Sequence, residues 1–179
     1  MPMVDRRILK SQEAIKNAFV ELMSEKNFDE ITMQNIADRA NVGRRTIYLH
    51  YMDKYDLLDK LTEEHINELS DLCELATDMN YIDAELLWFE YFERNYLFFS
   101  TMLASKGALY FRSRFLEFVL EELKNEVDIK EEKNHGEDVT LQFFGAAIVG
   151  VVEWWFKNGK PYSPQVMAER VGSLLDRNL

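Results

Sequence analysis

The stretch Thr32–Lys54, TMQNIADRANVGRRTIYLHYMDK, predicts two short helices joined by a tight turn. Thr32 is a favourable N-cap, since its hydroxyl can accept a hydrogen bond from an early helical N–H. Asn35 stands where a capping box has Glu or Gln, so we expect only a partial box. Residues 41–43, Asn-Val-Gly, end the first helix, because Asn and Gly adopt the backbone angles that a helix stop requires. The second helix then begins near Arg44.

The apolar residues of this stretch have helical spacing and face one side. Ile31 and Ile36 occupy the two positions of a hydrophobic staple, which sets the angle at which the chain enters the first helix. Ala37 continues that apolar face, and we expect Ile47 and Tyr51 to point inward from the second helix. The pattern therefore predicts a helical hairpin that is packed on its inner side.

A polar and basic set lies on the other side of the second predicted helix. It comprises Arg44, Arg45, Thr46, Tyr48 and His50. The second helix of a helix-turn-helix lies in the DNA major groove, with its N-terminal residues against base edges. A guanidinium can bond guanine O6 and N7 together, whereas Thr, Tyr and His can bond phosphates. On spacing alone, an ordinary helical hairpin with a solvated basic face is an equal alternative.

The same stretch resembles the DNA-binding domain of the TetR (tetracycline repressor) family. The positions that agree are Thr32, Ile36-Ala37, Val42-Gly43, Thr46-Ile47-Tyr48, His50-Tyr51, Lys54 and Leu57-Leu58. Ser is common in the family where Gly43 stands, and Phe where Tyr51 stands. The resemblance covers about the first third of the chain. It implies an all-α protein of about nine helices, with an N-terminal three-helix helix-turn-helix domain and a C-terminal helical ligand-binding and dimerisation domain.

Roles for individual residues follow from this resemblance. The residues expected to read bases are Arg44 and Arg45, with help from Gln34 and Thr46. The residues expected to hold phosphates are Thr32, Tyr48, His50 and Lys54. We place the DNA-binding domain at residues 1–54 and the regulatory and dimerisation domain at residues 55–179. The expected partner is a double-stranded DNA operator.

The composition bounds the class and compartment of the protein. Its 179 residues are 47% hydrophobic and 13% aromatic, which is ample for a packed core. We expect no stretch to approach the roughly 20 apolar residues of a membrane span. Residues 1–10 have no apolar signal core, and the single Cys73 cannot form an internal disulfide, so we expect a cytoplasmic protein. A small buried hydrophobe is the favoured interpretation of Cys73, with a redox-sensing thiol as the alternative.

The net charge of −11 is unevenly distributed. Residues 1–54 hold nine Lys/Arg and eight Asp/Glu, whereas residues 55–179 hold twelve Lys/Arg and twenty-four Asp/Glu. The net charge is therefore +1 in the first part and −12 in the second. An acidic body repels stray DNA and leaves contact to one face, which argues against a general DNA coater.

Helical periodicity predicts the remaining elements. The expected helices are about 5–24, 55–77, 82–104 (as one or two helices), 108–126, 139–156, and a last one that Ser163 caps and Pro164 begins. In the first of these, Ile8, Ile15 and Phe19 share the inner face. Residues 105–107 are expected to stop a helix, and the polar run 125–138 to form a loop without assigned function.

The aromatic helices predict where an effector would bind. The candidates for the wall of a pocket are Trp88, Phe92, Tyr96, Phe99, Tyr110, Phe111, Phe115, Phe144 and Trp154. Each of them alone is more typical of a plain core residue. An aromatic and acidic lining would suit an apolar or cationic compound. The C-terminal half resembles regulators near the one that controls dihydroxyacetone kinase genes, which does not name a ligand.

The last two helices predict a dimer interface. In the resembled family they form a four-helix bundle across a two-fold axis. The residues that suit this role are the small Gly145, Ala146 and Gly150 and the apolar Val171, Leu174 and Leu175. Without the family, an ordinary core within one chain is the preferred interpretation.

Other functions find less support. No paired carboxylates, nucleophile–base set or metal spacing indicates an enzyme, and we expect no cofactor. Glu64, His65 and Glu68 lack further ligands, so they predict a solvated polar face and not a metal site. An interaction module whose helix-turn-helix binds protein would show no salt-dependent binding to duplex DNA. The resemblance favours a ligand-released repressor that binds a palindromic operator as a homodimer over an activator or a regulator controlled by a protein partner.

Overall fold

The structure is a computed structural model that describes residues 6–104, 109–128 and 137–178. Within these residues the chain is helical throughout, without strands, as predicted. The elements are α1 (Arg6–Glu25), η1 (Phe28–Glu30, a 3-10 turn), α2 (Met33–Arg39), α3 (Arg44–His50), α4 (Lys54–Ala76), α5 (Tyr81–Arg94), α6 (Tyr96–Ala104), α7 (Leu109–Asp128), α8 (Glu137–Lys157) and α9 (Pro164–Asp176). The two helices α7 and α8 extend into the predicted loop 125–138. The rest of that loop, and the helix stop predicted at 105–107, lie outside the described residues.

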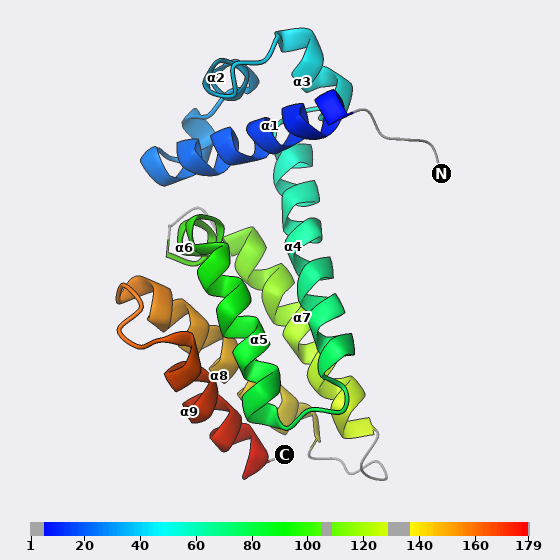
Figure 1. Cartoon of the computed structure of the whole chain (residues 1–179), viewed down its shortest axis with the longest axis vertical. Helices are drawn as coiled ribbons and strands as arrows, with labels where there is room; N and C mark the ends of the chain where they lie inside the picture. The colour runs from blue at the N-terminus through cyan, green and yellow to red at the C-terminus, as the bar shows by residue number, and fades with distance from the viewer. Residues whose placement is uncertain (1–5, 105–108, 129–136, 179) are drawn as a thin grey trace. The chain divides into compact units, whose positions relative to one another are not determined.

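The helices form two compact units, residues 1–64 and residues 65–179. The division falls inside α4, later than the domain boundary predicted after Lys54, and the functional boundary stays a prediction. In the first unit α1 packs against both α2 and α3, which meet at a turn (Figure 1). This is the arrangement of a helix-turn-helix that is supported by a third helix.

The inner faces of these helices make the core of the first unit. Ile15, Phe19, Ile36 and Ile47 are fully buried, as the spacing predicted. Ile8, which the pattern placed on the same inner face, is 42% exposed. It lies in the first turn of α1, where the end of a helix has fewer neighbours to cover it.

Local hydrogen bonds define where α2 begins and ends. Thr32 Oγ1 accepts a hydrogen bond from Asn35 N at 3.1 Å, and Asn35 Oδ1 accepts one from Thr32 N at 3.2 Å. The capping box is therefore complete, because the amide of Asn35 reaches back as Glu or Gln would, and the expectation of a partial box was wrong. The left-handed residue of the turn is Asn41, with φ 52°, whereas Gly43 is extended with φ −66°.

In the second unit α5 packs along α9, and α8 packs against α6 and α7 (Figure 1). The close approach of α5 and α9 depends on Gly172. A Cβ atom on Gly172 would lie 2.7 Å from Ile82 Cα and 2.8 Å from Ile82 N, which no side chain can tolerate without moving the backbone. Ser163 caps α9 and Pro164 occupies its first turn, as predicted.

Aromatic rings fill the centre of the second unit. The rings buried there include Phe89, Phe92, Phe99, Phe111, Phe115 and Trp155. The centroids of Phe92 and Phe99 are 4.8 Å apart and their planes are nearly perpendicular. The indole N–H of Trp155 donates a hydrogen bond to the carbonyl of Tyr162 at 2.9 Å, so the most deeply buried indole keeps a polar partner.

The helix α8 carries an apolar stripe that stays exposed. Val139 is 75% exposed and Phe143 is 67% exposed, and Ala146, Gly150 and Trp154 follow on the same face at helical spacing. By length and composition alone, the segment 139–157 is long and apolar enough to cross a membrane. The expectation that no stretch approaches this length was therefore wrong. Only 33% of this apolar segment is buried, so no other described residue covers the stripe.

Candidate nucleic-acid interface

The helix α3 presents its polar face to solvent. Ile47 is fully buried and fixes the orientation of the helix. Successive helical residues are about 100° apart, so Arg45 lies opposite Ile47, while Arg44 and Tyr48 lie on the flank. All three side chains are exposed, and neither guanidinium is ion-paired with a carboxylate of the described residues. Two unpaired guanidinium groups at the start of a short exposed helix are suited to bind an acceptor outside the chain.

Arg44 and Tyr48 support one another on this face. The guanidinium carbon of Arg44 lies 5.8 Å from the centre of the Tyr48 ring, within the range of a cation–π contact. The other two predicted residues of α3 are partly covered. Thr46 is half-buried, and its N–H donates to the carbonyl of Gly43 at 2.8 Å. His50 is half-buried, and its carbonyl accepts a hydrogen bond from Lys60 Nζ at 3.1 Å.

The two predicted residues near the start of α2 are also exposed, and both have internal partners. The hydroxyl of Thr32 accepts the capping bond, and its O–H can still donate to a phosphate. Gln34 Nε2 donates to Asp38 Oδ1 at 2.7 Å. A contact between Gln34 and a base would therefore compete with a bond inside the helix.

Lys54 has a structural role that sequence reasoning missed. Its Nζ donates to the carbonyls of Phe28 at 2.9 Å and Asp29 at 3.1 Å, and lies 4.6 Å from the centre of the Phe28 ring. These bonds join the first residue of α4 to η1. An ammonium has three donors, so one of them is left for a phosphate. No sequence signal predicts the role, because the acceptors are backbone carbonyls whose positions only the fold defines.

A second set of bonds fixes the link between α3 and α4. Asp53 Oδ1 accepts hydrogen bonds from Tyr55 N and Asp56 N, both at 2.9 Å, and so caps α4. Asp56 Oδ2 accepts one from Met52 N at 2.9 Å and one from Lys60 Nζ at 3.0 Å. The backbone bond and then the Lys60 ammonium hold the pKa of Asp56 below its usual value. Because both carboxylates bind the linker, α3 enters α4 at a defined angle.

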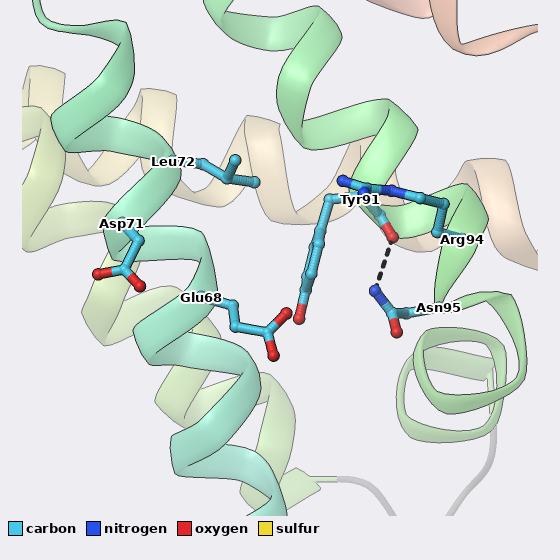
Figure 2. Close-up of a pocket in the computed structure, with 6 residues that line it drawn as sticks. All are labelled: Glu68, Asp71, Leu72, Tyr91, Arg94 and Asn95. Carbon is cyan, nitrogen blue, oxygen red and sulfur yellow. Dashed lines mark hydrogen bonds between the residues drawn. The ribbon is translucent and has the colours of Figure 1, made fainter. Parts of the chain in front are cut away.

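A polar cavity of about 430 Å³ lies between the second half of α4 and the end of α5 (Figure 2). Its lining residues are Glu68, Asp71, Leu72, Tyr91, Arg94 and Asn95. Figure 2 shows the carboxylate of Glu68 beside the hydroxyl of Tyr91. Asn95 Nδ2 donates to the carbonyl of Tyr91 at 3.1 Å, and the guanidinium carbon of Arg94 lies 5.9 Å from the Tyr91 ring centre. The carboxylate of Glu68 on α4 thus points toward the wall that carries the guanidinium of Arg94 and the amide of Asn95.

The wall of this cavity is supported by His65, which was expected on a solvated polar face. Instead His65 is half-buried, and its Nδ1 lies 2.5 Å from the Tyr91 hydroxyl. Its ring stacks on Phe98, with centroids 3.8 Å apart. The expectation was wrong because the partners of His65 come from α5 and α6, which helical spacing within α4 cannot reveal. Among the described residues, no group of His, Cys, Asp and Glu side chains could hold a metal ion.

None of the nine aromatic residues predicted to wall a pocket lines this cavity. Phe92, Phe99, Phe111 and Phe115 are packed core residues that are at most 1% exposed. The other five lie nearer the surface: Tyr96, Tyr110 and Trp154 are exposed, and Trp88 and Phe144 are half-buried. The space between the aromatic helices is thus filled by the rings themselves. Their role as a ligand wall stays a prediction.

The six residues predicted for a dimer interface divide into two groups. Gly145 is buried, and a Cβ atom there would lie 2.6 Å from Leu120 Cδ2, so its small size serves the packing of α8 on α7 within the chain. Val171 and Leu175 are also buried in the chain. Those left on the outer surface are the exposed Ala146 and Leu174 and the half-buried Gly150.

Comparison with known families matches both parts of the chain. Residues 15–61 match the family described as "Bacterial regulatory proteins, tetR family". Residues 79–177, more than half of the chain, match the family described as "Transcriptional regulator C-terminal region". Both are families of transcriptional regulators and not of enzymes. The predicted family and the all-α fold with an N-terminal helix-turn-helix are confirmed.

Individual relatives agree with the family match. The uncharacterized HTH-type transcriptional regulator YxbF of Bacillus subtilis (strain 168) is 24% identical over 185 residues, which cover 97% of this chain and 46% of that protein. The chain therefore spans about half the length of this curated relative. A TetR transcriptional regulator from Streptococcus agalactiae 2603V is 26% identical with a TM-score of 0.72, covering 96% of each chain. The dihydroxyacetone kinase operon activator DhaS, 20% identical, has a TM-score of 0.65, with 94% of this chain and 96% of that one covered, and it shares the fold.

Proposed function

Since the chain belongs to the TetR family of bacterial transcriptional regulators, we propose that it is a repressor that binds a palindromic operator as a homodimer and is released by a small molecule. The observation that carries the proposal is the exposed face of α3, where Arg44 and Arg45 form no ion pair with a carboxylate of the described residues. A guanidinium can bind guanine O6 and N7 together. Because neither guanidinium is held in an ion pair, binding to guanine does not require such an ion pair to be broken first.

The proposed contacts divide into base readout and phosphate binding. Arg44 and Arg45 read bases from the major groove, and Gln34 and Thr46 assist them. The proposed phosphate ligands are Thr32, Tyr48, His50 and Lys54. The exposed Arg45 and the flanking Arg44–Tyr48 pair support this division. The half-buried His50 and Lys54 expose less of their side chains and suit contacts with phosphates at the edge of the groove.

The proposed homodimer is formed by the outer faces of α8 and α9. The apolar stripe of α8 that contains Val139, Phe143 and Trp154, with the exposed Leu174 on α9, supports a second copy of the chain as its cover. Such exposed apolar surface is typical of protein interfaces. A dimer would relate two helix-turn-helix domains by a two-fold axis. This arrangement is suited to operator half-sites about 34–36 Å apart. Linking two binding events also raises specificity without new contacts.

The dimer is tested by sedimentation of variants. Phe143→Arg places a charge in the proposed interface, and we expect it to shift the protein from dimer to monomer. Leu75→Arg is the matched control, because Leu75 is 69% exposed but lies on α4. A Phe143→Arg protein that is folded and still dimeric would contradict the proposed interface.

The proposed effector site is the polar cavity between α4 and α5. The carboxylates of Glu68 and Asp71 favour a cationic compound over an apolar one, and Arg94 and Asn95 offer donors to a polar end of the same molecule. An effector releases DNA only to the extent that it binds the DNA-incompetent state more tightly. The double variant E68Q/D71N should therefore lose the response to a cationic effector while the protein still binds DNA.

The first test of the function is a binding titration by gel shift or fluorescence polarisation. The probe is DNA that flanks the protein's own gene, at two salt concentrations and with heterologous competitor. Tight, competitor-resistant binding that falls steeply with salt is the expected result. If the protein does not prefer that DNA over the competitor, a selection from random-sequence DNA should identify the operator. A selection that enriches no sequence would refute the proposal.

A second candidate is an activator with the same fold. The observation that favours it is the structural similarity to DhaS, described as an operon activator. At 20% identity the likeness concerns the fold, so the sign of regulation is tested separately. Transcription in vitro from the selected operator distinguishes the two, since a repressor lowers the transcript and an activator raises it. A response only when a partner protein is added would instead indicate control by that protein.

A further inference from the structure

Leu49 protrudes from the face of α3 that is opposite the core. It is 72% exposed, although Leu is a residue that folding normally buries. Leu49 is two residues after the buried Ile47, which places it about 200° around the helix axis. Arg45 is two residues before Ile47 and lies on the same outer side. These two side chains, four residues apart, therefore form the outermost row of the helix.

A single exposed Leu on a protein surface is ordinary, so its position matters more than its exposure. Leu49 lies in the row of side chains that would reach furthest into a groove, one helical turn after the guanidinium of Arg45. Met52, just after the helix, is also exposed. A Leu side chain can form no hydrogen bond with a phosphate or a base edge. The one apolar group that base pairs display in the major groove is the C5-methyl of thymine.

We infer that Leu49 is a specificity-determining residue that contacts a thymine methyl in each half-site of the operator. The inference rests on the proposed function, in which α3 enters the major groove. Four residues of an α-helix advance about 6 Å, and one base-pair step is about 3.4 Å. Because α3 would lie along the inclined groove and not along the duplex axis, the thymine is expected one or two base pairs from the guanine that Arg45 reads.

The test replaces the methyl and the side chain separately. In the selected operator, each thymine is replaced in turn by deoxyuridine, which lacks only the C5-methyl. The wild-type protein should lose about three- to fourfold in affinity at one position of each half-site, and about tenfold when both half-sites are changed, as the burial of one methyl group predicts. The Leu49→Ala protein should bind the unmodified operator more weakly and show no further loss with deoxyuridine at that position.

Two controls separate the possible outcomes. Leu75→Ala removes an equally exposed Leu from α4 and should leave the deoxyuridine profile unchanged. Thermal denaturation should show that Leu49→Ala is folded, since the side chain is mostly exposed. If wild type and Leu49→Ala respond alike to deoxyuridine at every position, the inference about Leu49 is overturned, whereas the proposed function as a DNA-binding regulator is not. If no duplex is bound specifically, the proposed function itself fails, and the inference with it.

Discussion

Arg39 and Glu25 form a bidentate ion pair, with Arg39 Nη1 2.8 Å from Glu25 Oε1 and Nη2 2.7 Å from Oε2. Nη1 also lies 3.3 Å from Glu21 Oε2. Arg39 is the last residue of α2 and Glu25 the last residue of α1. The pair therefore ties the two helix ends together, and planar guanidinium–carboxylate geometry makes this a directional contact.

This pair predicts a pH dependence of stability. The hydrogen bond from Arg39 is the main cause that lowers the pKa of Glu25 from 4.5. A carboxylate whose pKa is lowered by folding contributes stability above its unfolded pKa, and that stability is lost as the pH falls through the lower folded value. At pH values below about 4.5, we expect the melting temperature to decrease with falling pH less steeply in Arg39→Gln than in the wild type. Equal slopes would contradict the prediction, and Arg114→Gln, from an exposed pair with a 3.5 Å contact, is the control.

Substitutions in the proposed DNA-binding domain should distinguish the residues that read bases from those that bind phosphates. Arg44→Ala and Arg45→Ala should each cost roughly 1–3 kcal/mol of binding free energy and relax the preference at one base pair. Lys54→Ala should weaken binding to all sequences alike and reduce the salt slope by about one. The measurement is a titration of each variant against the operator and single-base changes at several salt concentrations. Equal losses on every sequence for the Arg and Lys variants would refute this division.

The Lys54 variant carries a second consequence that separates its two roles. Its bonds to the carbonyls of Phe28 and Asp29 are lost as well. We therefore expect Lys54→Ala to lower the melting temperature, whereas Arg45→Ala, at an exposed position, should leave it unchanged. Unchanged stability in both would show that the two carbonyl bonds contribute nothing measurable.

Gly172→Ala should destabilise the second unit. The added Cβ would meet the backbone of Ile82, which cannot rotate away as a side chain would. Overpacking of this kind typically costs about 1–3 kcal/mol in the free energy of unfolding. Denaturant unfolding at one protein concentration tests this, and a Gly172→Ala protein as stable as the wild type would contradict the prediction.

Thr62→Val should stabilise the first unit. Thr62 is 1% exposed, and within the described residues its Oγ1 has no hydrogen-bond partner. Valine keeps the shape and removes an unsatisfied buried hydroxyl, which should raise the free energy of unfolding by about 1 kcal/mol. Thr77→Val is the control, because Thr77 Oγ1 donates to the carbonyl of Glu74 at 2.9 Å, and its loss should not stabilise. A less stable Thr62→Val would show that the hydroxyl is satisfied in solution.

Local features were predictable because local residues define them. Thr32 and Ser163 cap helices, and Ile47 is buried, as expected from capping chemistry and helical spacing. The same spacing placed Arg44 and Arg45 on the exposed side of α3. These features depend on residues within one or two turns of each other, and a linear pattern records such neighbours.

Features that depend on distant residues were not predictable. Gly145 looked like a dimer residue but packs under Leu120 of α7, and the ring of His65 packs against Phe98 of α6. The aromatic helices predicted a pocket, whereas their rings fill the core and the observed cavity is polar. Periodicity shows that a helix has an apolar face, but it does not show which element covers that face.

The sequence by itself therefore determined the helix-turn-helix, the family and the polar face of α3, since capping, spacing and charge along about twenty residues specify them. Only the tertiary structure decided that Lys54 binds the carbonyls of η1, that Glu68 and Arg94 line one cavity, and that no other described residue covers the stripe of α8. The physical reason is that packing joins residues that are far apart in the chain. The burial of a side chain is a property of the neighbours that folding brings to it, and one helix does not contain that information.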